Sequence, residues 1–238
     1  MAYIRNAARR HYNDKKIKVG HSGTLDPFAT GLLLIGLGRD ATKQLDKFKN
    51  LPKTYIAKIT LGVVSDTYDS TGKITVVIPT SHSVIPAQAG IQENGIDSRF
   101  RGNDMDKRLK PNKKEIKKTL KQFIGQQEQI PPMHSAKKVK GKKLYALARR
   151  GIEVKREPHK IEIYKIKLLE YNYPRLKIEV KCSVGTYIRA LAHDIGQGLG
   201  TGAYCSELTR TKIGHFNLKK AFLPRDVNLS KLIDKSLT

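Results

Sequence analysis

The chain has 238 residues, 39% of them hydrophobic, which is enough for one substantial core. Its 46 lysines and arginines outnumber 21 acidic residues, and the resulting net charge of +25 favours a polyanionic partner such as nucleic acid. A lysine-rich surface from a biased proteome composition is the alternative. No apolar run approaches the about 20 residues of a membrane span, and no secretory signal is evident, so we expect a cytoplasmic protein.

Cysteine and histidine usage argues against disulfides and metal sites. The two cysteines, Cys182 and Cys205, are far apart in strand-like sequence, which is typical of buried thiols in a reducing compartment. The seven histidines show no metal-ligand spacing, so we expect no metal.

The first third of the chain contains a glycine- and threonine-rich stretch with a predicted helix and short strand before it and an apolar run after it. Residues 3–12 have helical spacing, and residues 17–19 are a short predicted strand. Asp26 then lies in the sequence GHSGTLDPFATGLLLIGLG, where the following proline biases it toward extended backbone. An Asp-Pro turn alone is usually only a turn. The apolar run close behind Asp26 is short enough to be one buried strand.

The middle of the chain alternates predicted helices and strands. Residues 42–51 and 111–125 should be helices, the second with a buried stripe that includes Ile124. Residues 54–62 alternate as a strand whose inner face includes Tyr55, and a core aromatic is the commoner fate of such a tyrosine. Residues 81–106 have turn formers throughout and no sustained period, which favours a tolerated surface loop.

Residues 134–156 are strongly basic, with a single acid, Glu153. This imbalance predicts either a solvated face or contact with phosphates. The candidate phosphate-binding cations are Lys137, Lys138, Lys140, Lys142, Lys143, Arg149 and Arg150.

The last third predicts two strands and a helix. The strand pattern of 160–171 breaks near Tyr164, as a β-bulge would cause, and residues 175–183 alternate regularly. A helix should follow Gly185 with Thr186 as its N-cap. Arg189 then falls in the first helical turn, where a cation is disfavoured, so a compensating anion is expected. The elements together predict an α+β fold with a mainly antiparallel mixed sheet and flanking helices.

Several of these stretches together resemble one enzyme family. The pattern GH-x-GTLDP-x-ATG-x-L is similar to the active-site motif of the TruB-type pseudouridine synthases, and the resemblance extends from about Lys16 to Phe216. It includes the segments Lys53-Thr54-Tyr55, Ser65-Asp66-Thr67-Tyr68-Asp69, Pro131-Pro132-Met133-His134-Ser135-Ala136 and Cys182-Ser183-Val184-Gly185-Thr186-Tyr187-Ile188-Arg189. It implies the pseudouridine synthase fold over residues 1–238, with a basic thumb at 127–156, and conversion of uridine 55 in the tRNA T loop to pseudouridine.

The resemblance also assigns roles. Asp26 is implied as the nucleophile, attacking C6 or C1′ or promoting a glycal route, and Arg189 as its partner. Tyr55 would stack on the flipped base, with a part in deprotonation as a second role. Tyr187 would line the pocket, and His21 would hold the unstacked loop. No cofactor is implied, and we expect a monomer that binds the T arm of tRNA.

The chain departs from the family pattern in three places. We find no KP-x-G-x-TS segment before the first helix, expect no C-terminal RNA-binding domain after Phe216, and interpret residues 81–106 as an insertion. The alternative function is therefore a catalytically impaired tRNA-binding relic or RNA chaperone. A general DNA-binding protein is weakly supported, because no helix-turn-helix, zinc-finger or basic-zipper pattern is present.

Overall fold

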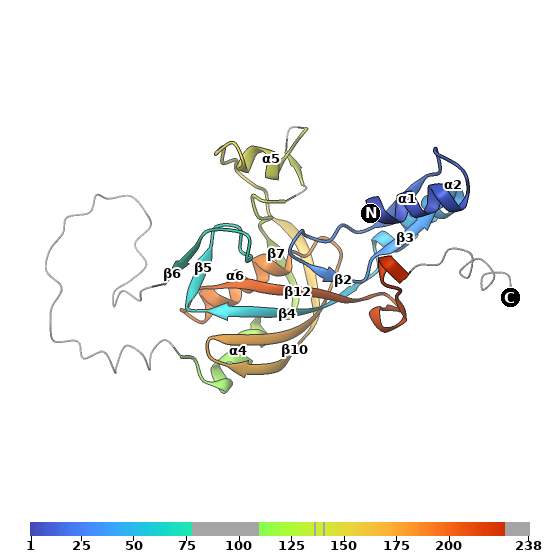
Figure 1. Ribbon diagram of the computed structural model, residues 1–238. Helices are drawn as coiled ribbons and strands as arrows, with labels where there is room; N and C mark the ends of the chain where they lie inside the picture. Colours follow the sequence, from blue (N-terminus) through green and yellow to red (C-terminus); the bar gives the residue numbers. More distant parts are fainter. Residues whose placement is uncertain (78–109, 136, 140, 227–238) are drawn as a thin grey trace, which may run out of the picture.

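The computed structural model describes residues 1–77, 110–135, 137–139 and 141–226, without the side chains of residues 138, 139, 142 and 143. Its centre is a seven-stranded sheet in the order β13, β12, β4, β11, β10, β7, with β2 pairing beside β12 (Figure 1). The strands are Thr30–Gly31 (β2), Lys53–Leu61 (β4), Gly125–Gln129 (β7), His159–Asn172 (β10), Arg175–Cys182 (β11), Ala203–Ile213 (β12) and Phe216–Asn217 (β13).

Strand direction matches the predicted fold class. Every pairing along the path from β13 to β7 is antiparallel, and β2 runs parallel to β12. The register between β10 and β11 shifts between Ile163 and Lys165, so the bulge predicted near Tyr164 is present. The α+β class with a mainly antiparallel sheet is confirmed.

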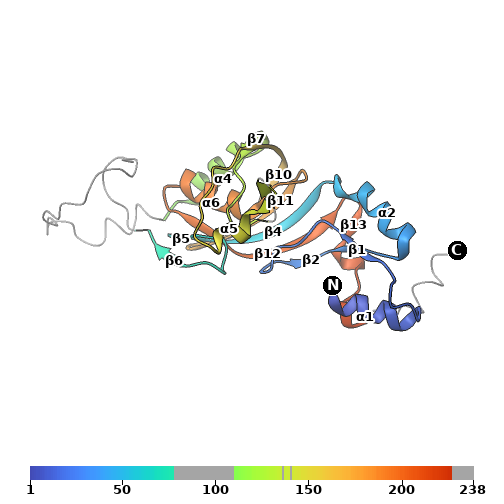
Figure 2. The ribbon, with the colours of Figure 1, turned by 90° about the horizontal axis from the view of Figure 1, so that it is seen from above.

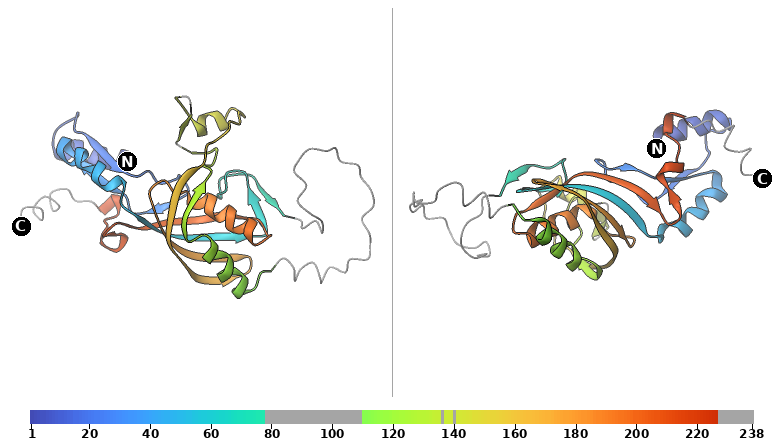
Figure 3. Two further views of the ribbon diagram at one scale, coloured as in Figure 1. Left: turned by 180° about the vertical axis from the view of Figure 1, so that it is seen from behind. Right: turned by 90° about the horizontal axis from the view of Figure 1, so that it is seen from below.

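One face of the sheet forms the core, because helices α4 (Lys113–Gln122) and α6 (Ile188–Gly198) cover it side by side (Figure 3). Strands β4 and β11 turn alternate aliphatic side chains toward these helices, as their alternation predicts. Full burial of one such side chain contributes about 1.5–3 kcal/mol, so a one-residue slip of either strand would be costly. The buried set includes Ala57, Ile59, Leu61, Leu176, Ile178, Val180, Leu191 and Ile195.

The N-terminal elements lie beyond one end of this core (Figure 2). They are α1 (Ala2–His11), β1 (Val19–Ser22), β3 (Leu34–Leu37) and α2 (Gly38–Lys49), and β1 and β3 form a separate antiparallel pair. The predicted helix at 3–12 is confirmed. The apolar run predicted as one buried strand forms β3, and three of the four β3 residues are only partly buried on this small two-stranded unit.

The first strand starts two residues later than predicted, and helix α2 starts four residues earlier than predicted. The first strand begins at Val19 and continues to Ser22, so it includes His21. Helix α2 begins four residues before Thr42, whose hydroxyl donates to the Gly38 carbonyl at 2.8 Å. A threonine inside the helix, hydrogen-bonded back to its first residue, therefore resembled a helix start.

Helix ends account for two further corrections. Helix α6 begins at Ile188 with Tyr187 as N-cap, because the Thr186 hydroxyl instead donates to the Ser183 carbonyl at 3.0 Å. Helix α4 ends at Gln122, so Ile124 lies outside it and is exposed rather than buried.

Residues 130–156, here called the thumb, project from the sheet (Figure 1). They carry β8 (Lys138–Val139), β9 (Lys142–Lys143) and α5 (Leu144–Ala148). Residues 127–129, which the prediction included in the thumb, pair with β10 as part of β7. Lys140 and the predicted insertion at 81–106 lie outside the described residues.

Short elements complete the described chain. A hairpin of β5 (Val63–Ser65) and β6 (Ile74–Val76) lies beside β12, and two 3-10 turns follow β13, η1 (Leu218–Lys220) and η2 (Pro224–Asp226). Among the described helices, none has the length and apolar character needed to cross a membrane.

Candidate active site

The loop between β1 and β2 carries Asp26. The Ala29 N–H donates to the Asp26 carbonyl at 2.9 Å, which closes a tight turn with Pro27 at the position that proline favours. Gly23 has a φ of +76°, in the left-handed region. Glycine is also required at Gly31, where a Cβ atom would lie 2.3 Å from the Arg210 carbonyl oxygen. The loop is therefore seated directly on β12.

Asp26 forms the ion pair that the sequence predicted. Arg189 Nε donates to Asp26 Oδ2 at 2.9 Å, and Arg189 Nη2 lies 3.5 Å from Oδ1. The arginine side chain is 2% exposed, whereas the aspartate side chain is 31% exposed. The guanidinium therefore orients the carboxylate from the interior of the protein, while the carboxylate remains accessible to solvent and substrate.

Backbone carbonyl groups fix the other side of the guanidinium. Arg189 Nη1 donates to the Thr67 carbonyl at 3.1 Å, and Nη2 donates to the His134 carbonyl at 2.6 Å. His134 lies at the base of the thumb, so one arginine joins the Asp26 loop, the β5–β6 hairpin and the thumb. Its planar fork meets these acceptors in a way that a lysine could not reproduce.

Asp69 is a second carboxylate at this site, and its sequence motif alone did not indicate a role. Asp69 Oδ2 lies 3.8 Å from Arg189 Nε, and the residue is 5% exposed. Its Oδ1 accepts hydrogen bonds from the Thr67 hydroxyl at 2.8 Å and from the Thr71 amide and hydroxyl at 2.9 and 2.6 Å. Asp69 thus supports Arg189 from the interior, on the side away from solvent.

Tyr55 and Tyr187 lie near this pair through different elements. Tyr55 is on β4 directly opposite Arg210 of β12, and burial raises the pKa of its phenol while the Arg210 charge opposes that rise. Tyr187 precedes α6, with the Arg189 guanidinium carbon 5.7 Å from its ring centroid. Gln129 fixes the Tyr187 backbone through hydrogen bonds of 2.8 and 3.1 Å.

The expected RNA-binding residues are distributed over two regions. His21 lies on β1 opposite Ile35, and its Nδ1 is buried without a hydrogen-bond partner in the described part of the chain. Lys137, Arg149 and Arg150 are exposed on the thumb, and the backbone of Lys138, Lys142 and Lys143 forms the β8–β9 hairpin. Among the thumb cations whose side chains the structure describes, Lys137, Arg149 and Arg150 form no ion pair with Asp26.

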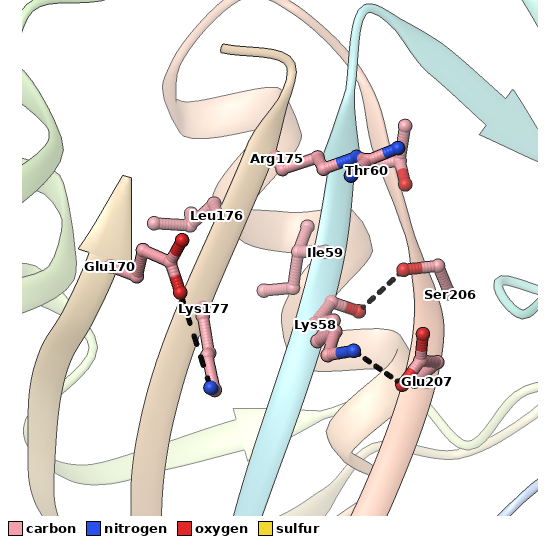
Figure 4. Close-up of a pocket in the computed structure, with 9 residues that line it drawn as sticks. All are labelled: Lys58, Ile59, Thr60, Glu170, Arg175, Leu176, Lys177, Ser206 and Glu207. Atoms are coloured by element: carbon pink, nitrogen blue, oxygen red, sulfur yellow. Dashed lines mark hydrogen bonds and ion pairs between the residues drawn. The ribbon is translucent and has the colours of Figure 1, made fainter. Parts of the chain in front are cut away.

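A polar pocket of about 450 Å³ opens on the other face of the sheet (Figure 4). Four of its five charged side chains form pairs: Lys58 Nζ lies 2.8 Å from Glu207 Oε2, and Lys177 Nζ lies 4.0 Å from Glu170 Oε2. The fifth, Arg175, is exposed. We therefore interpret it as the solvated face of the sheet. Within the described residues, no group of three His, Cys, Asp or Glu side chains could hold a metal ion.

Family comparison agrees with the motif. The model described as TruB family pseudouridylate synthase (N terminal domain) matches residues 9–93 and 84–188. The chain belongs to this TruB family. A second model, tRNA pseudouridylate synthase B C-terminal domain, matches residues 189–236, so the expected lack of a C-terminal domain is not confirmed. The insertion at 81–106 and the missing first motif remain predictions.

Curated relatives and solved structures extend the comparison. Proteins named tRNA pseudouridine synthase B are 42% identical in Protochlamydia amoebophila, 44% in Clostridium tetani and 40% in Bacteroides fragilis. The matches cover 92, 89 and 90% of this chain and 72, 63 and 80% of those proteins.

Two solved structures share the fold. The "Crystal Structure of a Cbf5-Nop10-Gar1 Complex" is 26% identical, covering 90% of this chain and 45% of that chain with a TM-score of 0.56. The "Structure of H/ACA RNP bound to a substrate RNA containing 2'-deoxyuridine" is 24% identical, covering 84 and 40% with a TM-score of 0.51.

Proposed function

We propose that this chain isomerises uridine 55 in the T loop of tRNA to pseudouridine, with Asp26 as the catalytic carboxylate. The observation that carries the proposal is the Asp26–Arg189 pair, in which a buried guanidinium holds a carboxylate that is 31% exposed. The relatives named tRNA pseudouridine synthase B support uridine isomerisation in tRNA.

The reaction breaks the C1′–N1 bond of uridine, turns the uracil ring and forms a C1′–C5 bond. The C5 proton is lost and N1 gains one, so the product is an isomer and no electrons are transferred overall. An ionised carboxylate can serve this chemistry in three ways: by adding to C6, by adding to C1′, or by promoting a glycal. All three need Asp26 in its charged form and in a fixed direction, which the Arg189 contacts support.

The uracil must leave its stack before the carboxylate can reach the reacting bond. Base extrusion costs a few kcal/mol, which stacking and phosphate contacts must offset. Tyr55 supplies an aromatic face on one side of the site, and Tyr187 supplies another beside Arg189. Burial raises the pKa of the Tyr55 phenol above its ordinary value of 10.0, which favours the neutral ring, and we assign this ring to stacking on the uracil. His21, on strand β1 shortly before the Asp26 loop, contacts the unstacked loop.

Phosphate contacts come from the thumb. Its exposed cations can neutralise phosphates of the T arm and release their counterions, which provides affinity without base specificity. The hydrogen bond from Arg189 to the His134 carbonyl connects the thumb base to the catalytic pair. We expect one monomer to act on one tRNA, without a metal.

Release of tritium from tRNA labelled at C5 of the T-loop uridine tests this function, alongside filter binding of the same tRNA. Asp26→Asn should abolish release and keep tRNA affinity within about threefold, because the phosphate contacts lie elsewhere. Asp46→Asn is the matched control, because Asp46 on α2 is 73% exposed. Substantial turnover by Asp26→Asn would refute the catalytic assignment. A parent chain that binds tRNA without releasing tritium would instead indicate a binding-only protein.

A further inference from the structure

Strand β12 places a second arginine inside the molecule. Arg210 is 1% exposed, and in the described part of the chain no carboxylate lies within ion-pair distance of it. A buried charge without a counter-ion is costly unless its donors are all directed at good acceptors. The hydrogen-bond acceptors around Arg210 must therefore offset the cost of burying its charge.

Its guanidinium donates to the two ends of the Asp26 loop and also interacts with the phenol of Tyr55 on the neighbouring strand. Arg210 Nη2 donates to the Gly23 carbonyl at 2.9 Å, and Nε donates to the Leu32 carbonyl at 2.8 Å. The Arg210 backbone carbonyl in turn accepts from the Leu32 N–H at 2.8 Å. One residue thus connects the point where the chain leaves β1 with the point where it leaves β2, and Asp26 lies between these points.

The surroundings of Arg210 also favour its direction toward the loop. Lys53, on the neighbouring strand, is 5% exposed, and burial together with the Arg210 charge lowers its pKa. The Lys53 ammonium donates to the carbonyls of Lys49 and Leu51, on the side of β4 where α2 ends. Because the two cations repel each other, each is directed at its own set of carbonyl groups.

We propose that Arg210 is a positioning residue that holds residues 23–32 and thereby sets where the Asp26 backbone lies. This inference rests on the proposed function. The two arginines have complementary roles, because Arg189 orients the carboxylate group and Arg210 fixes the loop from which that group extends. Catalytic constellations tolerate displacements of only about 0.5 Å, so a loop with one end released should fail in turnover before it fails in folding.

Arg210→Met keeps an unbranched apolar stem and removes the guanidinium donors, and Arg210→Lys keeps the charge with a single nitrogen. Arg175→Met is the matched control, because Arg175 is an exposed cation of β11 far from the loop. We expect single-turnover tritium release by Arg210→Met to fall about a hundredfold, with tRNA affinity within about threefold of the parent, since a displacement of about 1 Å costs that much in rate. Arg210→Lys should lie between Arg210→Met and the parent chain.

Two further measurements distinguish positioning from general stability. In Arg210→Ala, millimolar ethylguanidinium should restore part of the rate, whereas ethylammonium at the same concentration should restore less. Amide hydrogen exchange in Arg210→Met should accelerate in residues 24–30 and stay unchanged in β4 and β11. This exchange pattern does not depend on activity, so it tests the inference even if the parent chain proves inactive.

The inference is overturned if Arg210→Met turns over at the parent rate, or if exchange rises equally throughout the sheet. Were Arg210→Met not to fold, Arg210→Lys would decide: parent-like turnover and loop exchange would contradict the positioning role. An inactive Asp26→Asn beside a fully active Arg210→Met would leave the proposed function standing and remove the role of Arg210.

Discussion

Replacement of Arg189 by lysine tests the geometry of the site most directly, because it keeps the charge and removes the fork. In the structure the guanidinium donates at 2.9 and 3.5 Å to Asp26 and at 3.1 and 2.6 Å to the Thr67 and His134 carbonyls. A lysine has one nitrogen at the end of a flexible stem and can reach only part of this set. Either the Asp26 carboxylate or the carbonyl groups lose their donor.

The size of the effect follows from these contacts. A hydrogen bond to a charged group is worth about 1.5–3 kcal/mol, and the loss of one such bond to Asp26 also releases the carboxylate's direction. We take the lost hydrogen bond and the lost orientation of the carboxylate together to cost about 2–4 kcal/mol of transition-state stabilisation. The rate then falls by about 30- to 1000-fold. The phosphate contacts are unaffected, so tRNA affinity should change by less than about threefold.

The assay is single-turnover tritium release with enzyme in excess over tRNA, which separates the chemical step from product release. Filter binding and a thermal melt of Arg189→Lys show whether the protein still binds and folds. A rate within about threefold of the parent would refute the reasoning, because it would mean that charge alone is sufficient and the two-point geometry is not needed.

Two further predictions concern the surroundings of this pair. Asp69→Asn should lower the isomerisation rate by about ten- to a hundredfold with unchanged tRNA affinity, because it removes one of the two charges that hold Arg189; a parent-like rate would contradict this role. If roughly 6–10 phosphates are contacted, tRNA affinity should fall by about three to five orders of magnitude between 50 and 200 mM salt. Alanine substitution of the thumb lysines should reduce the slope of log affinity against log salt concentration. The control substitutions Lys117→Ala and Lys121→Ala on α4 should leave this slope unchanged. The substituted thumb residues are Lys137, Lys138, Lys140, Lys142 and Lys143.

The sequence predicted strands β4, β10 and β11, for a physical reason, but it predicted no strand for β7 or β12. In β4 and β11 every second residue is aliphatic, since one face meets α4 and α6 and the other meets water. Strand β12 does not follow so simple a pattern. Its register shifts between Cys205 and Glu207 and again between Arg210 and Lys212, so its inward positions lose the strict period of two. A charged residue in such a strand suggests exposure, and for this reason the burial of Arg210 was not predicted.

The pairing of Asp26 with Arg189 was predicted, because the start of α6 called for an anion near Arg189 and the family resemblance supplied Asp26 as that anion. The remaining contacts of Arg189 could not be found in the same way. They involve the backbone carbonyls of Thr67 and His134, and every residue type has a backbone carbonyl. Side-chain identity therefore contains no signal for them, and only the three-dimensional fold brings these groups to the guanidinium.

Asp194 on α6 gives a stability prediction that is separate from catalysis. Burial raises its pKa from 3.8 to about 6, and the described residues form no ion pair or hydrogen bond with its carboxylate. Between pH 3.8 and 6 the folded protein therefore binds more protons than the unfolded chain. The free energy of unfolding must fall as pH rises through this window and stay at the lower level above it.

Asp194→Asn removes this penalty, because an amide stays neutral at every pH. The full shift corresponds to about 3 kcal/mol, and partial exposure to water screens it, so we expect a gain of about 1–2 kcal/mol at pH 8. For a chain of this size that gain raises Tm by about 2–8 °C. The gain should vanish near pH 4, where the parent carboxyl is also protonated. Thermal melts of the parent, Asp194→Asn and the exposed control Asp46→Asn at both pH values measure the difference, and a lower Tm for Asp194→Asn at pH 8 would mean that the carboxylate is stabilised in the folded protein after all.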